Sequence, residues 1–281
     1  MISSRAFAKI NLGLRILGKR PDNYHNIETI FTTISLHDEI TVTRTEQGIS
    51  LTCPGTRLPT SRHNLAYCAA ALFLEHSRLE AGVSILLQKK IPIGAGLGGG
   101  SADAACVLKM LRDLFGLVTS DQELVELGRT LGMDVPFFIR GGAACARGRG
   151  DELEHFRLPR LSLVICHPGF SISTKWAYEN IGSNLTKEEN WITMLRKGLE
   201  TQDFALVRQY LINDFEPLVF KIYPELGRLK EELLKLGAHG ALLSGSGSTL
   251  YAIVDETSKP GILQFLKEHR KQYSVAETGS S

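Results

Sequence analysis

A glycine-rich loop between a strand-like and a helix-like segment is the feature that most constrains this chain. Five glycines fall within seven positions: Gly94, Gly96, Gly98, Gly99 and Gly100. The loop follows the apolar segment 83–87 and precedes 102–114, whose apolar residues recur with a period near 3.6. Backbone N–H groups without side chains can converge on one point, which the positive end of the following helix also faces. We therefore predict an anion site, most often one for phosphate, rather than a flexible turn or a close helix–strand contact.

The loop lacks the marks of two common nucleotide-binding motifs. No lysine follows the glycines, as the Walker A loop requires. A dinucleotide-binding fingerprint needs an acidic residue about 20 positions further on. Asp121 lies at that distance, but within the helix start Ser-Asp-Gln-Glu rather than at a strand end. The pattern therefore favours neither motif.

Composition sets broad bounds. The 281 residues suit one large domain or two small ones, and a net charge of +2 without a long basic run argues against a nucleic-acid partner. Five scattered cysteines, odd in number and without a C-x-x-C pair, indicate reduced thiols rather than disulfides or a zinc site. The N-terminus has no signal-peptide pattern, and the uncharged stretch 237–254 is too rich in glycine and serine for a membrane helix. We expect a cytoplasmic protein that has no membrane partner.

The first half reads as strands followed by helices. Residues 5–18 alternate, which places Lys9 and Asn11 side by side on one face of a strand. Further segments are strand-like at 27–36, 39–44, 48–53 and 83–87 and helical at 64–76. Ser120 and Glu123 form a capping-box pattern for a short helix that ends near residue 131.

The second half mixes strands and helices without strict alternation. Strand-like segments are 161–166, 241–244 and 250–254; helix-like segments are 175–181, 188–199, 204–212, 225–236 and 261–271. The last residues, 277–281, read as frayed. This mixture indicates an α+β fold rather than a doubly wound sheet. We place a boundary near residues 150–160, with an N-terminal ATP-binding domain at 1–155 and a C-terminal substrate-side domain at 156–281.

Two residues stand out as candidates for phosphoryl-transfer chemistry, which needs a carboxylate near the attacking hydroxyl and a cation near the moving charge. Asp134 lies between Met133 and Val-Pro-Phe-Phe, where an unpaired carboxylate would be costly. It could instead cap the following helical turn. Lys9 lies in an apolar strand, although it could simply face solvent there. Local sequence leaves both alternatives open.

The stretch from Pro92 to Ala102, Pro-x-x-x-Gly-Leu-Gly-Gly-Gly-Ser-Ala, resembles the phosphate loop of the GHMP kinase superfamily, whose members phosphorylate small-molecule alcohols. Three more blocks extend the resemblance over nearly the whole chain: 8–12 with Tyr24 and His25, 132–138, and 243–249. The resemblance is closest to the branch of the superfamily that uses a cytidyl diphosphate substrate in non-mevalonate isoprenoid biosynthesis. It implies a two-domain α+β fold with the active site between the domains.

The resemblance also implies roles for individual residues. Asp134 would be the base and Lys9 its cationic partner. ATP would be bound by Pro92, Ile93, Gly94, Ala95, Gly96, Leu97, Gly98, Gly99, Gly100, Ser101 and Ala102. The substrate would be bound by Asn11, Tyr24, His25, Tyr178, Gly245, Ser246 and Gly247. Tyr24 and Tyr178 would stack on the cytosine, with Trp176 and Phe170 as competitors for the second position.

One departure concerns the metal. Many superfamily members have two serines where this chain has Gly99 and Gly100, and one of those serines binds magnesium. We therefore expect Mg²⁺ to be held mainly by ATP phosphates and water and assign no ligand, reading Asp103 as a first-turn carboxylate favoured by the helix dipole. Arg147-Gly-Arg149-Gly could be a phosphate patch, but a solvated loop is the simpler interpretation.

Two other functions remain open from the sequence. Another alcohol kinase of the superfamily, acting on mevalonate, homoserine or a sugar, would not need an aromatic residue and a histidine near residue 24. A non-catalytic nucleotide-binding relative would not need to keep both Lys9 and Asp134. The oligomeric state cannot be read from the sequence.

Overall fold

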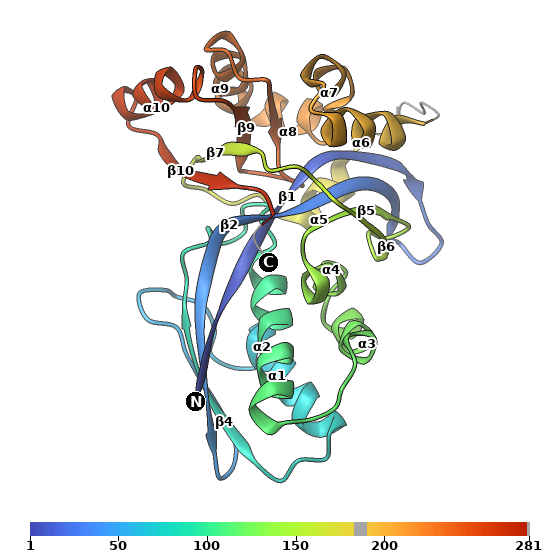
Figure 1. Cartoon of the computed structure of the whole chain (residues 1–281), viewed down its shortest axis with the longest axis vertical. Helices are drawn as coiled ribbons and strands as arrows, with labels where there is room; N and C mark the ends of the chain where they lie inside the picture. The colour runs from blue at the N-terminus through green and yellow to red at the C-terminus, as the bar shows by residue number, and fades with distance from the viewer. Residues whose placement is uncertain (183–189, 280–281) are drawn as a thin grey trace.

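A computed structural model describes residues 1–182 and 190–279 of the chain. Its elements are divided between two sheets (Figure 1). The first sheet has the order β3-β4-β2-β5-β6, with β1 paired to β2, and the second has the order β10-β7-β9-β8. Neighbouring strands are antiparallel except for β3 and β4, so the first sheet is mixed and the predicted α+β class is confirmed.

The strands of the first sheet are β1 (Ile2–Lys19), β2 (His25–Thr45), β3 (Ile49–Thr52), β4 (Gly82–Gln88), β5 (Ala143–Arg147) and β6 (Glu152–Phe156). The helices beside it are α1 (Leu65–His76), α2 (Gly99–Phe115), α3 (Asp121–Leu131) and α4 (Val135–Arg140). Figure 1 shows α1–α4 together on one side of the long strands. The buried residues near the start of α2 are mostly small and include three alanines, Ala102, Ala104 and Ala105, which lets this end of the helix pack closely.

The strands of the second sheet are β7 (Ser162–His167), β8 (Gly240–Leu243), β9 (Leu250–Val254) and β10 (Gln272–Glu277). Its helices are α5 (Thr174–Asn180), α6 (Trp191–Thr201), α7 (Phe204–Tyr210), α8 (Glu216–Ile222), α9 (Pro224–Lys235) and α10 (Lys259–Glu268). The division that we predicted at residue 155 falls at the end of β6 and stays a prediction. Within residues 1–182 and 190–279, no helix combines the length and the apolar character needed to cross a membrane.

The paired strands β1 and β2 run through both halves of the molecule (Figure 1). Their register shifts three times, between Phe7 and Lys9, Asn11 and Leu14, and Ile16 and Gly18. Such bulges bend and twist a strand, which is how the 18-residue β1 can stay paired with β2 and still curve to lie against Trp191 and Leu195 of α6. Residues 8–16 are buried on both faces, so the half-exposed strand that the alternation suggested is a fully covered one.

Several element predictions need correction. The segments 27–36 and 39–44 form one strand, because the polar residues between them continue the pairing with β1 and Asp38 is satisfied by Lys89 and by backbone N–H groups. The tail predicted to fray begins inside β10, and Thr278 bonds to the backbone of Leu161. The strands β5, β6 and β10 and the helix α8 had no predicted counterpart. The start of the helix predicted at 188–199 lies outside the described residues, and α6 begins at Trp191.

Candidate active site

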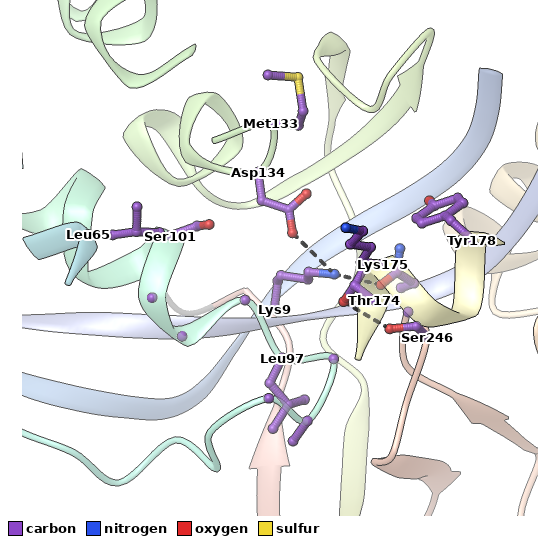
Figure 2. Close-up of a pocket in the computed structure, with 18 of the residues that line it drawn as sticks. Lys9, Leu65, Leu97, Ser101, Met133, Asp134, Thr174, Lys175, Tyr178 and Ser246 are labelled. Atoms are coloured by element: carbon purple, nitrogen blue, oxygen red, sulfur yellow. Dashed lines mark hydrogen bonds and ion pairs between the residues drawn. The ribbon is translucent and has the colours of Figure 1, made fainter. Parts of the chain in front are cut away.

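A cleft of ≈ 890 Å³ is lined by residues of both halves of the molecule. One end is lined by residues 58–59 and 63–65, at the start of α1. The opposite end is lined by Tyr24, His25, Arg149 and Tyr178. The glycine loop and the Lys9–Asp134 pair lie between these two ends. In Figure 2, Leu65 and Ser101 are on one side of that pair, and Thr174, Tyr178 and Ser246 are on the other.

The glycine loop is fastened to both halves. Gly94, Gly96 and Gly98 have positive φ values of 65°, 79° and 68°, which side chains disfavour. The Ser244 hydroxyl donates to the carbonyl of Gly96 at 2.9 Å, and the Lys9 N–H donates to the carbonyl of Leu97 at 3.0 Å. A Cβ at Gly96 would overlap the Ser244 carbonyl oxygen. The loop therefore has a fixed shape rather than the freedom of an open turn.

Of the residues predicted to bind ATP, Pro92 to Ser101 all line the cleft. Ala102 does not; it belongs to the buried face of α2, is 2% exposed and packs in the core. Gly98 is the N-cap of α2, so the free N–H groups of the first turn begin at the point where the loop meets the cleft. This arrangement matches the anion site predicted from the glycines, whose binding role stays a prediction.

Lys9 is a buried cation at the centre of the cleft. Its Nζ lies 3.6 Å from Oδ2 of Asp134, 2.7 Å from Oδ1 of Asn11 and 4.9 Å from the centre of the Phe31 ring. Its side chain is only 6% exposed, and this burial lowers its pKa, although the Asp134 charge opposes the shift. The solvent-facing alternative for Lys9 is therefore wrong.

Asp134 occupies the N-cap position of α4, yet its side chain makes no capping hydrogen bond. It points instead toward Lys9 and remains 34% exposed to the cleft (Figure 2). A carboxylate that makes no capping hydrogen bond and faces a buried ammonium is available to a ligand. The geometry thus favours the functional interpretation over the capping one.

Asn11 lines the cleft, but both polar atoms of its side chain are already used. Its Oδ1 accepts from Lys9, and its Nδ2 donates to Thr29 Oγ1 at 2.8 Å. Thr29 in turn donates to the carbonyl of Gly13 at 2.5 Å. This chain of hydrogen bonds fixes the direction of the Lys9 ammonium. The side chain of Asn11 therefore positions Lys9, and its contact with a substrate stays a prediction.

Asp38, Lys89 and Asp103 form a buried cluster beneath the loop. Lys89 Nζ contacts Oδ2 of Asp38 and lies 2.8 Å from Oδ2 of Asp103. Burial, and then the nearby Asp38 charge, raises the pKa of Asp103 to about 8, although Lys89 opposes the shift. The first-turn placement that we expected for Asp103 is therefore wrong: the residue lies beyond the first turn of α2, and its carboxyl is buried against Lys89. Among the residues described, no group of three or more histidine, cysteine or acidic side chains could hold a metal ion.

The far end of the cleft is aromatic. His25 stacks on Tyr178 with ring centres 5.1 Å apart, and Tyr178 and Phe215 pack nearly perpendicular to each other with ring centres 4.9 Å apart. Burial lowers the pKa of His25 and raises that of Tyr178. Neither Trp176 nor Phe170 lines the cleft, and Phe170 stacks on Tyr223 instead. Tyr178 is therefore the best placed of the three candidate aromatics.

The second turn places Gly245 and Ser246 at the cleft, whereas Gly247 faces Leu243 and Ile172 in the core. The hydroxyls of Ser246 and Thr174 are 3.1 Å apart. The sequence did not point to Thr174 or residues 58–65 as part of the site, and it offered Arg149 only within a turn interpreted as a solvated loop. Residues 58–65 could have been predicted as a loop that ends at a helix start, because Asn64 is a typical capping residue and it caps α1.

The charges of the lining suit anionic ligands. Five cationic residues line the cleft against three carboxylates: Lys9, Lys19, Lys89, Arg149 and Lys175 against Asp103, Asp134 and Glu179. A cleft with an excess of one charge attracts ligands of the opposite charge. Polyanions such as nucleotides fit this excess.

A glycine loop at a helix start, facing a buried lysine–aspartate pair between two α+β halves, defines an ATP-dependent small-molecule kinase of the GHMP class. The family models agree: GHMP kinases N terminal domain matches residues 64–142, and GHMP kinases C terminal matches residues 195–272. A homoserine kinase from Cytophaga hutchinsonii shares the fold, with a TM-score of 0.76, 21% identity and coverage of 99% of this chain and 94% of that one.

Closer relatives specify the family. The chain is 37% identical to 4-diphosphocytidyl-2-C-methyl-D-erythritol kinase of Acetivibrio thermocellus over 99% of both proteins. It is 43% identical to the enzyme of the same name from Syntrophus aciditrophicus, over 90% of this chain and 89% of the relative. A crystal structure of 4-(cytidine 5'-diphospho)-2C-methyl-D-erythritol kinase matches with a TM-score of 0.86, at 34% identity and full coverage of both chains. The chain belongs to the 4-diphosphocytidyl-2-C-methyl-D-erythritol kinase family.

Proposed function

We propose that this kinase transfers the γ-phosphoryl group of ATP to the 2-hydroxyl of 4-diphosphocytidyl-2-C-methyl-D-erythritol, a step of non-mevalonate isoprenoid biosynthesis. The placement of the Lys9–Asp134 pair carries the proposal, because it lies between the phosphate-type loop and the stacked aromatic residues. ATP would occupy the end lined by the loop and residues 58–65. The cytidyl substrate would occupy the end lined by Tyr24, His25 and Tyr178.

The chemistry follows from the pair. The Asp134 carboxylate accepts the proton of the 2-hydroxyl as the oxygen forms its bond to the γ-phosphorus, and the bond to the β–γ bridging oxygen breaks to release ADP. Lys9 stabilises the charge on the attacking oxygen and on the phosphoryl group. Asn11 and Thr29 hold the ammonium in place, so the charge need not reorganise during the reaction.

The N–H groups of the loop and of the first turn of α2 would bind the phosphates of ATP. Magnesium bound to those phosphates would neutralise their charge. Ser101 and Asp134 are the oxygen donors that line this part of the cleft, whereas Asp103 is engaged by Lys89. Phosphate oxygens and water would supply the remaining ligands, as is usual for Mg²⁺. Because ATP is the donor and all five cysteines are free thiols, we place the reaction in the cytoplasm.

Product analysis tests the proposal directly. The purified chain is incubated with ATP, Mg²⁺ and the cytidyl substrate, and phosphorus NMR follows the new phosphomonoester. Mevalonate, homoserine and a sugar alcohol serve as competing acceptors. We expect turnover of the cytidyl substrate only; preferred turnover of another alcohol would reject the substrate assignment and leave the kinase class intact.

A further inference from the structure

We propose that Arg149 is a positioning residue that holds the Tyr24 ring as one wall of the cytosine site. The inference rests on the proposed function, because it assumes that Tyr24 stacks on the base. The guanidinium carbon lies 5.4 Å from the centre of the Tyr24 ring, and both residues line the cleft. A cation over one face of a ring leaves the opposite face free for a base.

The turn that carries Arg149 is built against the start of β2. Gly148 and Gly150 flank the arginine with positive φ values of 64° and 97°, a conformation that other residues rarely adopt. The Ile27 N–H donates to the carbonyl of Gly148 at 2.8 Å. This bond ties the turn between β5 and β6 to the strand that begins directly after Tyr24, so the two side chains are brought together by the backbone.

The guanidinium is itself held. Nη2 of Arg149 lies 3.1 Å from Oδ2 of Asp151, whose side chain is only 13% exposed. A guanidinium whose charge already meets a sheltered carboxylate has less to offer a substrate phosphate. This ion pair favours a role for Arg149 in positioning Tyr24 rather than in binding the diphosphate of the substrate.

The backbone of Tyr24 is also fixed. Its N–H donates to Oδ1 of Asp22 at 3.1 Å, and its carbonyl accepts from the Arg20 N–H at 2.7 Å. Asn23 adopts a left-handed φ of 66°, as such turns require. The side chain is 48% exposed, so ring rotation is the main freedom that remains, and the Arg149 contact restricts it.

The neighbouring arginine of the same Arg-Gly-Arg-Gly turn provides a matched control. Arg147 lies 3.2 Å from Glu28 and 3.7 Å from Glu154, and it does not line the cleft. The two arginines share one turn and differ in what they face. The motif is therefore more than a solvated loop, because one of its two arginines lines the cleft.

The test compares Arg149→Met, Arg147→Met, Tyr24→Leu and the double variant Arg149→Met/Tyr24→Leu. Arg149→Met is expected to raise the KM for the cytidyl substrate about two- to fivefold, the range for a cation–π contact at a half-exposed site. The KM for ATP and kcat should stay unchanged, and Arg147→Met should change none of the three. Arg149→Lys should restore part of the affinity, because it keeps a cation near the ring.

The double variant decides between the two roles. If Arg149 acts through Tyr24, removing Arg149 from Tyr24→Leu adds no further rise in KM. A further rise of the same size would show that Arg149 contacts the substrate itself and would overturn the inference. A normal KM in Arg149→Met together with a raised KM in Tyr24→Leu would also overturn the inference.

A folding failure of Arg149→Met and a failure of the proposed function can each be told apart from a failure of the inference. If Arg149→Met fails to fold, Asp151→Asn releases the guanidinium without removing it and should raise the same KM; an unchanged KM there overturns the inference. Failure of the unaltered chain to phosphorylate the cytidyl substrate, with turnover of another alcohol, would instead reject the proposed function.

Discussion

At the scale of one residue, the side chain of Asp134 makes a tertiary contact in place of the helix-capping hydrogen bond that its local sequence favours. An aspartate before a helical turn normally caps it, but here the N-cap side chain turns toward the Lys9 ammonium. The ammonium is buried, so it needs a counter-charge more than the short α4 needs a cap. The apolar neighbours of Asp134 made it a candidate in the sequence; only the fold could show where the carboxylate points.

The role of Asp134 is tested by Asp134→Asn, which keeps the shape but cannot accept the proton. We expect kcat to fall at least ~10²-fold, the lower end of what general-base catalysis contributes. ATP affinity should change little because the loop is untouched. Steady-state kinetics with Asp113→Asn, an exposed carboxylate on α2, as the control would check this; a near-normal kcat would remove Asp134 from the mechanism.

The aromatic wall is tested by Tyr178→Ala. Base–aromatic stacking is worth roughly 1–3 kcal/mol, so the KM for the cytidyl substrate should rise about 5- to 150-fold while that for ATP stays near normal. Trp176→Ala is the control, since Trp176 lies on the same helix but does not line the cleft. A larger rise in KM from Trp176→Ala than from Tyr178→Ala would show that Trp176, and not Tyr178, stacks on the cytosine.

The Asp103 cluster predicts a pH dependence of stability. Because the folded pKa, about 8, lies above the unfolded value of about 3.9, the folded state holds a proton that the unfolded chain releases. The free energy of unfolding that this group contributes therefore falls as pH rises from about 4 to 8. Asp103→Asn lacks this loss, so its Tm relative to the unaltered chain should increase from pH 5 to pH 8.

Thermal unfolding at several pH values measures the Asp103 effect. Asp113→Asn again serves as the control and should follow the unaltered chain, since its carboxylate is 63% exposed. A Tm difference for Asp103→Asn that does not vary with pH would show that Asp103 titrates normally in the folded state.

Among the elements, the glycine loop and its helix were the most predictable part of the chain. Local chemistry determines them: glycines at positive φ, a helix with a 3.6 period, and the Ser120–Glu123 capping box, which is confirmed. Long-range pairing determines the elements that were missed. The strand β10 pairs with β7, more than a hundred positions away along the chain, and nothing in its own sequence marks that partner.

The loop is tested by Gly96→Ala. Its Cβ would overlap the Ser244 carbonyl oxygen and its φ is +79°, so the loop must leave the second half of the molecule. We expect a loss of about 1–3 kcal/mol in unfolding free energy and weaker ATP binding, measured by denaturant unfolding and calorimetry.

Gly100→Ala is the matched control for the stability of the loop. Its Cβ would meet only Leu65 Cδ1, at 3.5 Å, and it lies in the first turn of α2, where alanine suits a helix. Its unfolding free energy should not decrease. An equal loss in both variants would show that the contact with Ser244 is not what holds the loop.

At the scale of the whole molecule, the two halves are joined by side chains as well as by β1 and β2. Nδ2 of Asn213 donates to the carbonyls of Leu243 and Gly245, at 2.7 and 2.8 Å, and its Oδ1 accepts from Phe215. The neighbouring Asp214 accepts from the Ile16 N–H of β1 at 2.7 Å. The Asp214 bond connects the far half of β1 to the second half, and the Asn213 bonds within the second half connect the adjacent residue to the turn that faces the cleft.

Asn213→Ala tests this connection. It leaves buried carbonyls without their donor, and each unsatisfied group costs about 1–3 kcal/mol. We expect the free energy of unfolding in urea to fall by about 2–3 kcal/mol. Asn180→Ala, at an exposed asparagine of α5, should change it by less than about 0.5 kcal/mol. Similar small losses in both would remove Asn213 from the junction.

The course of β1 through both halves has a consequence for synthesis on the ribosome. The Trp191 ring lies against Gly13, and Leu195 lies beside it. At about 5–20 residues per second, the ribosome needs on the order of 10–40 seconds to make the roughly 180 residues between strand and cover. During that interval the second half of β1 lacks the Trp191 and Leu195 side chains that bury it in the folded protein. The second half of β1 is therefore made well before the helix that covers it, and it is a stretch that a nascent-chain chaperone could protect in the meantime.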